Sequence, residues 1–187
     1  MVRGAEYHAD MNTKRICLSV MVFACLGTPP TVTAGPEQAV NLGIYRHVDH
    51  STFTELPFHD GDFSYGVAYE IHEGGAFWQL GVDMTPSFKG TNGAESVTDY
   101  AITPQLNLIF TDRLLMAGVG ILSSYVKPKE GDADWMDPYW QFILGLDIPL
   151  GRITLDLYSC YVFKQWDKLN DFDAKDIEFG GRLGFKF

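Results

Sequence analysis

Apolar and polar side chains alternate one by one along most of the chain after residue 40. The last segment is the clearest example, and its apolar face carries Ile177, Phe179, Gly181, Leu183, Phe185 and Phe187. Its other face carries Asp176, Glu178, Gly180, Arg182, Gly184 and Lys186. Successive side chains of a β-strand point to opposite faces of the sheet. The pattern therefore predicts a strand with one apolar face and one charged face.

The same alternation predicts seven more strands, at 40–50, 62–72, 75–86, 98–111, 114–127, 136–150 and 152–165. Short connections lie at Glu73-Gly74, Asp112-Arg113 and Leu150-Gly151, and long ones at about 51–61, 87–97, 128–135 and 166–175. Short turns at one end and long loops at the other, with an even number of strands, are typical of outer-membrane barrels. We therefore predict an all-β fold, a closed antiparallel up-and-down transmembrane β-barrel of eight strands with both termini in the periplasm.

The N-terminal part has the three elements of a secretory signal peptide. Lys14 and Arg15 precede an apolar run of 12 residues, 16–27, and small residues follow at 32–34. The run is too short to cross a membrane as a helix, which takes about 20 residues. We expect a signal peptide over 1–34 and an outer-membrane barrel domain over 35–187.

Two alternatives concern the leader itself. Met11 stands where a start codon for this leader is expected, so it is a candidate for the true start. A lipoprotein signal ending at Cys25 is less favoured, because the bulky Phe23 lies beside its cleavage point.

Charge and cysteine content narrow the possible functions. The formal net charge is -10, which disfavours a nucleic-acid binder because phosphate binding needs a basic surface. Cys17 and Cys25 lie in the leader, so Cys160 remains alone and no intramolecular disulfide is expected. We expect Cys160 to be a small, inert packing residue.

Alternation alone leaves open which face of the barrel points inward. A soluble periplasmic barrel of the lipocalin type puts its apolar face around an apolar ligand. Here the aromatic residues of the apolar faces gather toward the two strand ends, as at Tyr100 and Phe110, while aliphatic residues such as Leu106 lie between them. Two aromatic belts around an aliphatic band are typical of a lipid-facing wall. We therefore predict that the apolar face points outward.

The polar faces then line the interior. We expect a barrel-interior polar network of Glu70, Asp83, Asp147, Asp156, Glu178, Arg182 and Lys186. Arg182 and Lys186 are the expected counter-ions of the inward carboxylates. Two residues fit the pattern poorly: Pro104 lies inside a strand and predicts a local bulge, and Arg46 fits only at the rim.

Two segments resemble a known family. The terminal segment Phe179–Phe187 is similar to the assembly signal of bacterial outer-membrane barrels, with Phe179, Leu183, Phe185 and Phe187 as its apolar positions. Ile102–Leu108 resembles a strand of small OmpA/OmpX-like barrels. The resemblance implies insertion by the outer-membrane assembly machinery, and contact with outer-membrane lipid and lipopolysaccharide. We expect a monomer.

The sequence offers little catalytic or metal chemistry. His47, His50 and His59 lie in or near the first long loop, and Asp49-His50-Ser51 has residue types suited to nucleophilic catalysis. Neighbours in an extended chain point apart and form no triad, so we expect solvated loop residues. A lipid A-modifying enzyme, which by resemblance needs a histidine in the late strands, remains a weaker alternative because no histidine follows His72.

Metal binding and transport are equally weakly supported. Acidic residues in the loops, Glu130, Asp132, Asp134, Asp167, Asp171 and Asp173, have no calcium-loop pattern. We expect no cofactor, no metal and no catalytic residue. An interior of eight strands is filled by side chains, among which we expect Phe77, Gln141 and Tyr158. We therefore expect a structural or surface-interaction role with exposed loops, rather than diffusion through a pore.

Overall fold

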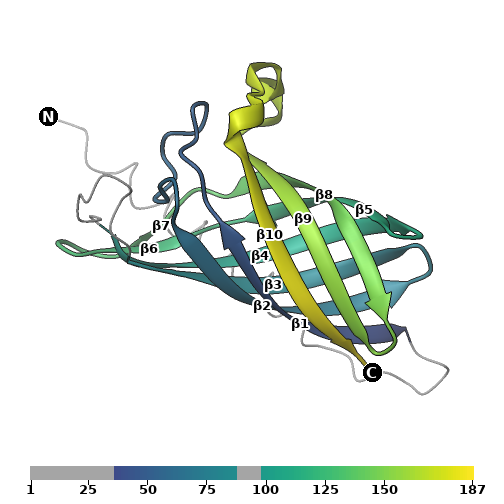
Figure 1. The fold of residues 1–187 in the computed structure, drawn as a ribbon. Coiled ribbons are helices and arrows are strands. Elements are labelled where there is room, and N and C mark those ends of the chain that lie inside the picture. The colour runs from purple at the N-terminus through teal and green to yellow at the C-terminus, as the bar shows by residue number, and fades with distance from the viewer. Residues whose placement is uncertain (1–35, 88–97) are drawn as a thin grey trace, which may run out of the picture. The chain divides into compact units, whose positions relative to one another are not determined.

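Ten strands form one antiparallel sheet that closes on itself (Figure 1). The computed structural model describes residues 36–87 and 98–187, so the expected leader and the segment 88–97 lie outside the described residues. The strands are β1 (Glu37–Arg46), β2 (Phe63–Glu73), β3 (Ala76–Pro86), β4 (Thr98–Asp112), β5 (Leu115–Leu122), β6 (Tyr125–Pro128), β7 (Asp134–Trp135), β8 (Tyr139–Leu150), β9 (Ile153–Phe163) and β10 (Ile177–Lys186). Two short 3-10 helices, η1 (Trp166–Asp171) and η2 (Ala174–Asp176), precede β10. Within the described residues, no helix has the length and apolarity needed to cross a membrane.

The sheet closes where the last strand meets the first, with Leu42 opposite Leu183. β5 and β6 both pair with β4, and the register is the same on the two sides of the gap between them, so they form a single interrupted strand. The register shifts near the loop end, between Thr98 and Tyr100 of β4. β7 pairs with β6, and β8 pairs with β5. β7 and β8 therefore form a second interrupted strand. With each interrupted strand counted once, the barrel has eight strands, which confirms the predicted closed antiparallel fold.

The connections have the predicted arrangement. Tight turns at 74–75, 113–114 and 151–152 lie at one end, and loops at 47–62, 129–133 and 164–176 lie at the other. Gly74 and Gly151 have positive φ angles of 63° and 76°, which glycine adopts without the penalty of a Cβ. The predicted long connection at 87–97 falls almost entirely outside the described residues. Both ends of the barrel domain lie at the turn end, where the Phe187 N–H donates to the Gln38 carbonyl.

The bulge predicted at Pro104 is wrong. Pro104 pairs in register with Val82 inside an unbroken β4. The interruption falls in the neighbouring strand, between β5 and β6, where Ser123 lies beside Pro104. Proline has no N–H to donate to the ladder, so the partner strand loses its regular pairing while β4 remains continuous.

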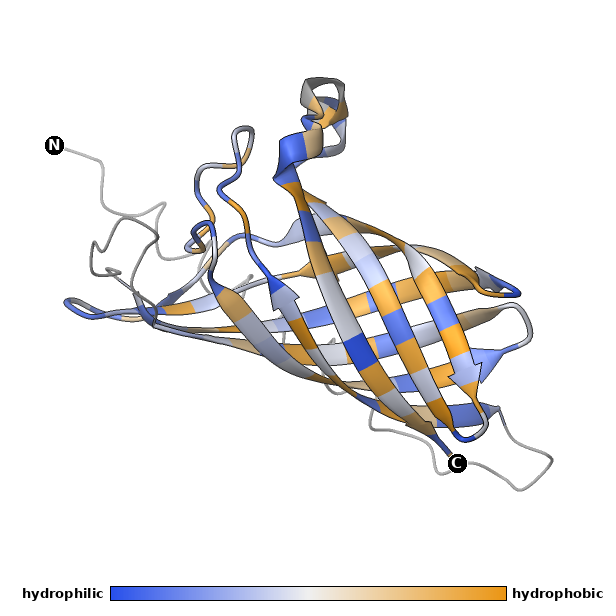
Figure 2. Cartoon of the chain, viewed as in Figure 1, coloured by the Kyte–Doolittle hydropathy of each residue, from blue (hydrophilic) through white to orange (hydrophobic). Residues whose placement is uncertain are grey.

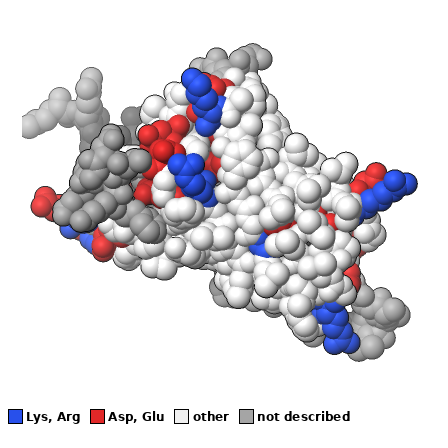
Figure 3. All heavy atoms as spheres, in the orientation of Figure 1, with Lys and Arg blue, Asp and Glu red and all other residues white. Residues whose placement is uncertain are grey.

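The two faces of the wall differ sharply in chemistry. The strands in Figure 2 alternate between hydrophobic and hydrophilic residues, and the large apolar side chains of the hydrophobic set are exposed. They include Leu42, Val67, Trp78, Val82, Leu144, Leu157, Phe179 and Leu183. Charged residues on the face shown in Figure 3 gather toward the two ends and are sparse on the wall between them. The barrel therefore presents its apolar side chains outward.

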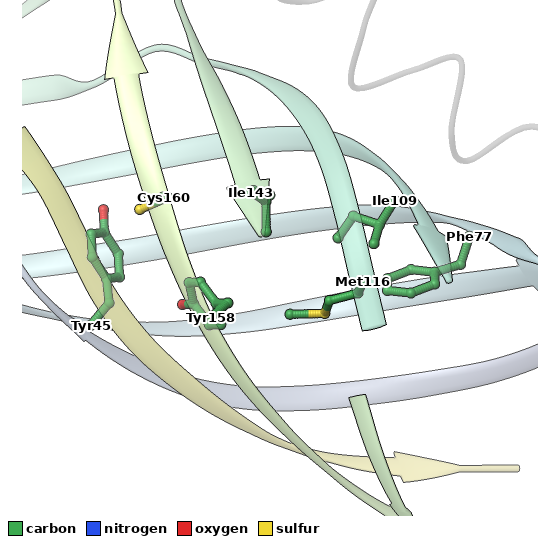
Figure 4. Close-up of a cluster of buried hydrophobic side chains, with 7 residues drawn as sticks. All are labelled: Tyr45, Phe77, Ile109, Met116, Ile143, Tyr158 and Cys160. Atoms are coloured by element: carbon green, nitrogen blue, oxygen red, sulfur yellow. The ribbon is translucent and has the colours of Figure 1, made fainter. Parts of the chain in front are cut away.

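The lumen is filled by side chains. It holds an apolar cluster of Tyr45, Phe77, Ile109, Met116, Ile143, Tyr158 and Cys160 (Figure 4). Phe77 and Tyr158 therefore occupy the interior as predicted, and Cys160 is buried as a packing residue. An amide network of Gln79, Gln105, Asn107 and Gln141 lies on the same inward faces, and all four side chains are buried. The sequence therefore predicted two of the seven residues of the apolar cluster in the interior, but not the cluster itself.

Candidate functional site

The first long loop closes the barrel at the loop end. Its apolar residues Phe53, Leu56 and Phe58 pack with the inward residues Ala101, Leu122, Tyr139 and Val162 in a second buried cluster. The Phe53 ring meets the Tyr139 ring edge-on, with centroids 5.5 Å apart. We call residues 47–62 the plug loop, because burial of these side chains seals the mouth of the lumen.

A buried carboxylate at the start of β10 holds the base of the plug loop. Glu178 Oε1 lies 2.8 Å from His47 Nδ1 and 3.2 Å from His50 Nε2. Glu178 is 2% exposed and His47 is 1% exposed. An ionised carboxylate only accepts hydrogen bonds, so both imidazole nitrogens carry the hydrogen. Such charge-assisted bonds are about twice as strong as neutral ones. They join Glu178 to His47, 131 positions earlier in the chain, and to His50, 128 positions earlier.

His47 also extends the network toward β2 and β3. Its Nε2 lies 2.7 Å from Ser64 Oγ, which lies 2.5 Å from Thr85 Oγ1. The Phe58 ring stacks on the imidazole with centroids 4.0 Å apart. Glu178, His47 and Ser64 thus have the order of an acid–base–nucleophile triad. Ser64 is 0% exposed and already bonded to Thr85, so the arrangement holds the loop rather than presenting a nucleophile.

A second carboxylate, Asp176, fixes the next two residues of the plug loop. Ser51 donates to Asp176 Oδ1 from its N–H (2.9 Å) and its hydroxyl (3.1 Å). Thr52 donates to Oδ2 from its N–H (3.3 Å) and its hydroxyl (2.9 Å). Burial by itself raises the pKa of the Asp176 carboxyl, but these hydrogen bonds outweigh it and hold the pKa below its ordinary value of 3.8.

Two exposed ion pairs lie at the edge of the plug loop. Arg46 Nη2 lies 2.7 Å from Asp60 Oδ1, so Arg46 sits at the rim as expected. Lys164, just after β9, pairs with Glu55. Exposed pairs of this kind contribute about 0–1 kcal/mol, so the buried carboxylates dominate the attachment of the loop.

The other residues of the predicted interior network lie on inward positions along the barrel. Glu70, Asp83, Asp156 and Arg182 are buried, whereas Asp147 and Lys186 are partly exposed. Gln79 Nε2 donates to Glu70 Oε1 (2.7 Å), and Gln105 Nε2 donates to Asp83 Oδ2. These amides were not among the predicted network residues, although they share the alternating polar faces.

The two expected counter-ions make different contacts from each other. Arg182 lies opposite Asp156 in the β9–β10 ladder, and its guanidinium donates to Gln79 Oε1 at 2.7 Å. The same guanidinium lies over the Tyr158 ring, 4.4 Å from its centroid. Lys186 pairs with Glu37 at the turn end. The ion-pair partners of Glu178 are instead the two histidines.

The expectation that His47 and His50 are solvated loop residues is wrong. Both are buried, because the plug loop folds into the mouth instead of extending into water. His59 is the exception, with an exposed side chain. Asp49, His50 and Ser51 form no triad, since His50 bonds to Glu178 and Ser51 bonds to Asp176. In the described part of the chain, no group of three or more His, Cys, Asp or Glu side chains is placed to hold a metal ion.

Sequence comparison adds little to this picture. No family model matches the chain, and no curated protein matches it. The structure is similar to Neisserial surface protein A, with 13% identity, a TM-score of 0.46, and coverage of 81% of this chain and 96% of that one. It is also similar to the Yersinia pestis outer membrane protein Ail, with 10% identity, a TM-score of 0.46, and coverage of 81% and 99%. Function must therefore be inferred from the residues of this chain.

Replacing Glu178 by glutamine should loosen the plug loop. The change keeps the size of the side chain but removes the charge that both histidines share. We therefore expect the rate of amide hydrogen exchange in residues 47–62 to rise about tenfold, which corresponds to a loss of about 1.4 kcal/mol in the free energy of opening the loop. Hydrogen-exchange mass spectrometry of the detergent-solubilised protein measures this. The matched control, Glu55→Gln, breaks only an exposed pair and should leave exchange nearly unchanged. Equal exchange in the two variants would contradict the role of Glu178.

The hydrogen bonds from the plug loop to the Asp176 carboxylate should weaken in acid. A carboxyl whose pKa is lowered by folding contributes stability that is present above its unfolded pKa, near 3.8, and is lost as the pH falls through the folded pKa. Pepsin cleaves after Phe and Leu and works in acid, so it reports opening of the plug loop. At pH 4.5 we expect Asp176→Asn to be cleaved faster than the native protein. The ratio of the two cleavage rates should approach one toward pH 2. A ratio that stays constant with pH would refute the role of the Asp176 carboxylate in holding the plug loop.

Proposed function

We propose that this protein is an integral outer-membrane β-barrel with a sealed lumen, which acts through a structural or surface-interaction role of its loops. The observation that carries the proposal is the reversed distribution of polarity. Side chains such as Leu144 (61% exposed) cover the outside, whereas Gln79 and Asn107 (both 0%) lie inside. Monomeric soluble proteins rarely expose apolar surface on this scale, and lipid is the solvent that favours it.

The height of the apolar wall supports the same proposal. On β8 and β9 the outward side chains run from the pair Leu150–Ile153 to the pair Trp140–Phe163, ten residues along the ladder. At about 3.4 Å per residue and a strand tilt of about 40°, this corresponds to about 25 Å. That is the height of the apolar band of outer-membrane barrels.

The contents of the lumen disfavour the alternatives. A soluble barrel that binds an apolar ligand needs an apolar cavity, whereas the interior here is filled by amides, charged groups and the cluster around Phe77. The same filling and the plug loop oppose a diffusion pore. A lipid-modifying enzyme based on His50 and Ser51 is disfavoured, because both residues are engaged in holding the plug loop.

Partners and orientation follow from the proposed location. Lipid and lipopolysaccharide would contact the outer wall, the turn end and both termini would face the periplasm, and the loops would face outward from the cell. Phe179, Leu183, Phe185 and Phe187 are all exposed on the outside of the last strand. This exposure makes them available to the assembly machinery during insertion. We expect the inserted protein to be a monomer.

Fractionation of expressing cells tests the location. We expect the protein in the outer-membrane fraction, with different gel mobility before and after boiling because a closed barrel resists detergent until it is heated. A soluble periplasmic protein with no mobility shift would refute the proposal and would favour the ligand-binding barrel.

A pair of arginine substitutions on one strand tests the contact with lipid. Leu144 and Leu150 are exposed to nearly the same extent, 61% and 59%, but Leu144 lies at mid-height and Leu150 at the turn end. In lipid vesicles we expect Leu144→Arg to lower the free energy of unfolding by about 2–4 kcal/mol and Leu150→Arg by about 0–1 kcal/mol. Unfolding in urea measures both. Equally small losses would indicate that the wall faces water.

A further inference from the structure

The last long loop carries two large apolar side chains beyond the end of β9. Trp166 and Phe172, in and just after η1, are 48% and 54% exposed. Figure 1 shows the two 3-10 helices standing at the loop end, next to β9 and β10. The plug loop does not account for these side chains, because its apolar residues are buried in the mouth.

Both side chains rest on the outer face of the wall. The Trp166 ring contacts the rings of Trp140 (5.3 Å between centroids), Phe142 (5.7 Å) and Phe163 (5.1 Å). Phe172 contacts Tyr161 at 4.8 Å. These four partners belong to the outward faces of β8 and β9, where Trp140 is opposite Phe163 and Phe142 is opposite Tyr161.

The loop therefore covers the outer face at the loop end of the wall. Phe163 and Tyr161 face outward but are buried, whereas Phe142, two positions further down β8 than Trp140, is exposed. Trp166 and Phe172 cover the upper aromatic residues and present their own rings instead. The exposed apolar surface thus continues without a break from Leu144 through Phe142 to the loop.

The height of this contact is defined by the register. The pair Trp140–Phe163 lies at the loop-end edge of the apolar band, about 25 Å from the pair Leu150–Ile153. A ring that packs on this pair lies where the hydrocarbon layer meets the headgroups. Trp and other aromatic side chains favour that boundary, and the neighbouring Asp167 and Lys175 are exposed and suited to the polar side.

We propose that residues 166–172 form an anchor on the outer leaflet, in which Trp166 and Phe172 insert into the boundary between lipid headgroups and acyl chains. This inference rests on the proposed membrane location. The occupant of the exposed aromatic surface is lipid, because the surface is continuous with the lipid-facing band and lies at its upper edge. The anchor would hold the last loop against the membrane and leave the plug loop to seal the lumen.

Trp135 provides a matched control within the same chain. It is 40% exposed and its ring lies 5.3 Å from Tyr125 on the outward face. Ile121 of β5 is the partner of Trp140. Tyr125 of β6 lies four residues further along the same interrupted strand. That distance corresponds to about 10 Å beyond the edge of the band. A similar exposed tryptophan is therefore expected in water, above the membrane.

Single-tryptophan proteins test the anchor. Each retains Trp166, Trp135 or the wall residue Trp78, with the other tryptophans replaced by phenylalanine, in phosphatidylcholine vesicles whose acyl chains carry bromine near the headgroup or near the chain end. We expect Trp166 to be quenched at least twofold more by the shallow bromine than by the deep one, and to be protected from iodide in the buffer. Trp135 should show the reverse, with strong iodide quenching and little bromine quenching.

The outcomes separate this inference from the proposed function. If Trp78 is quenched by bromine but Trp166 responds only to iodide, the wall is in lipid and the anchor is refuted. If neither quencher reaches Trp166 while Trp78 is quenched, a second copy or another part of the protein covers the surface, which also refutes the anchor. If Trp78 itself escapes bromine, the proposed membrane location fails first.

Discussion

Closure of the sheet between β1 and β10 is the constraint on which the rest of the structure depends. Closure of the eight-stranded wall leaves each described strand except the short β7 paired on both sides, so only two environments remain, inside and outside. The interior of an eight-stranded barrel is just wide enough to be filled by side chains. Polar groups that point inward must therefore find partners, and apolar groups that point outward need an apolar solvent.

Three sets of side chains inside the barrel meet the first demand. Amides and charged groups bond across the barrel around Gln79, an apolar cluster extends from Phe77 near the turn end to Tyr45 near the loop end, and the plug loop closes the mouth. The plug loop depends on Glu178 and Asp176, two carboxylates near the start of β10. The strand that closes the barrel thus also holds the loop that seals it.

The outer wall meets the second demand. Its apolar height fits the hydrocarbon layer, and the last loop extends its aromatic surface through Trp166. The two long loops described in most detail therefore have opposite roles: one turns inward over the lumen, and the other lies on the outer face.

The sequence by itself determined the number of strands and the positions of the tight turns, because alternation along a strand is a local property. The outward direction of the apolar faces followed from the aromatic residues at the two strand ends. It also identified the inward positions of Glu178 and Arg182. Only the tertiary structure decided their partners, since His47 and Glu178 are 131 residues apart and meet through closure of the barrel and folding of the loop. No local pattern distinguishes a histidine in water from one buried in the mouth. For the same reason the break opposite Pro104 was misplaced, because the missing N–H affects whichever strand pairs with it.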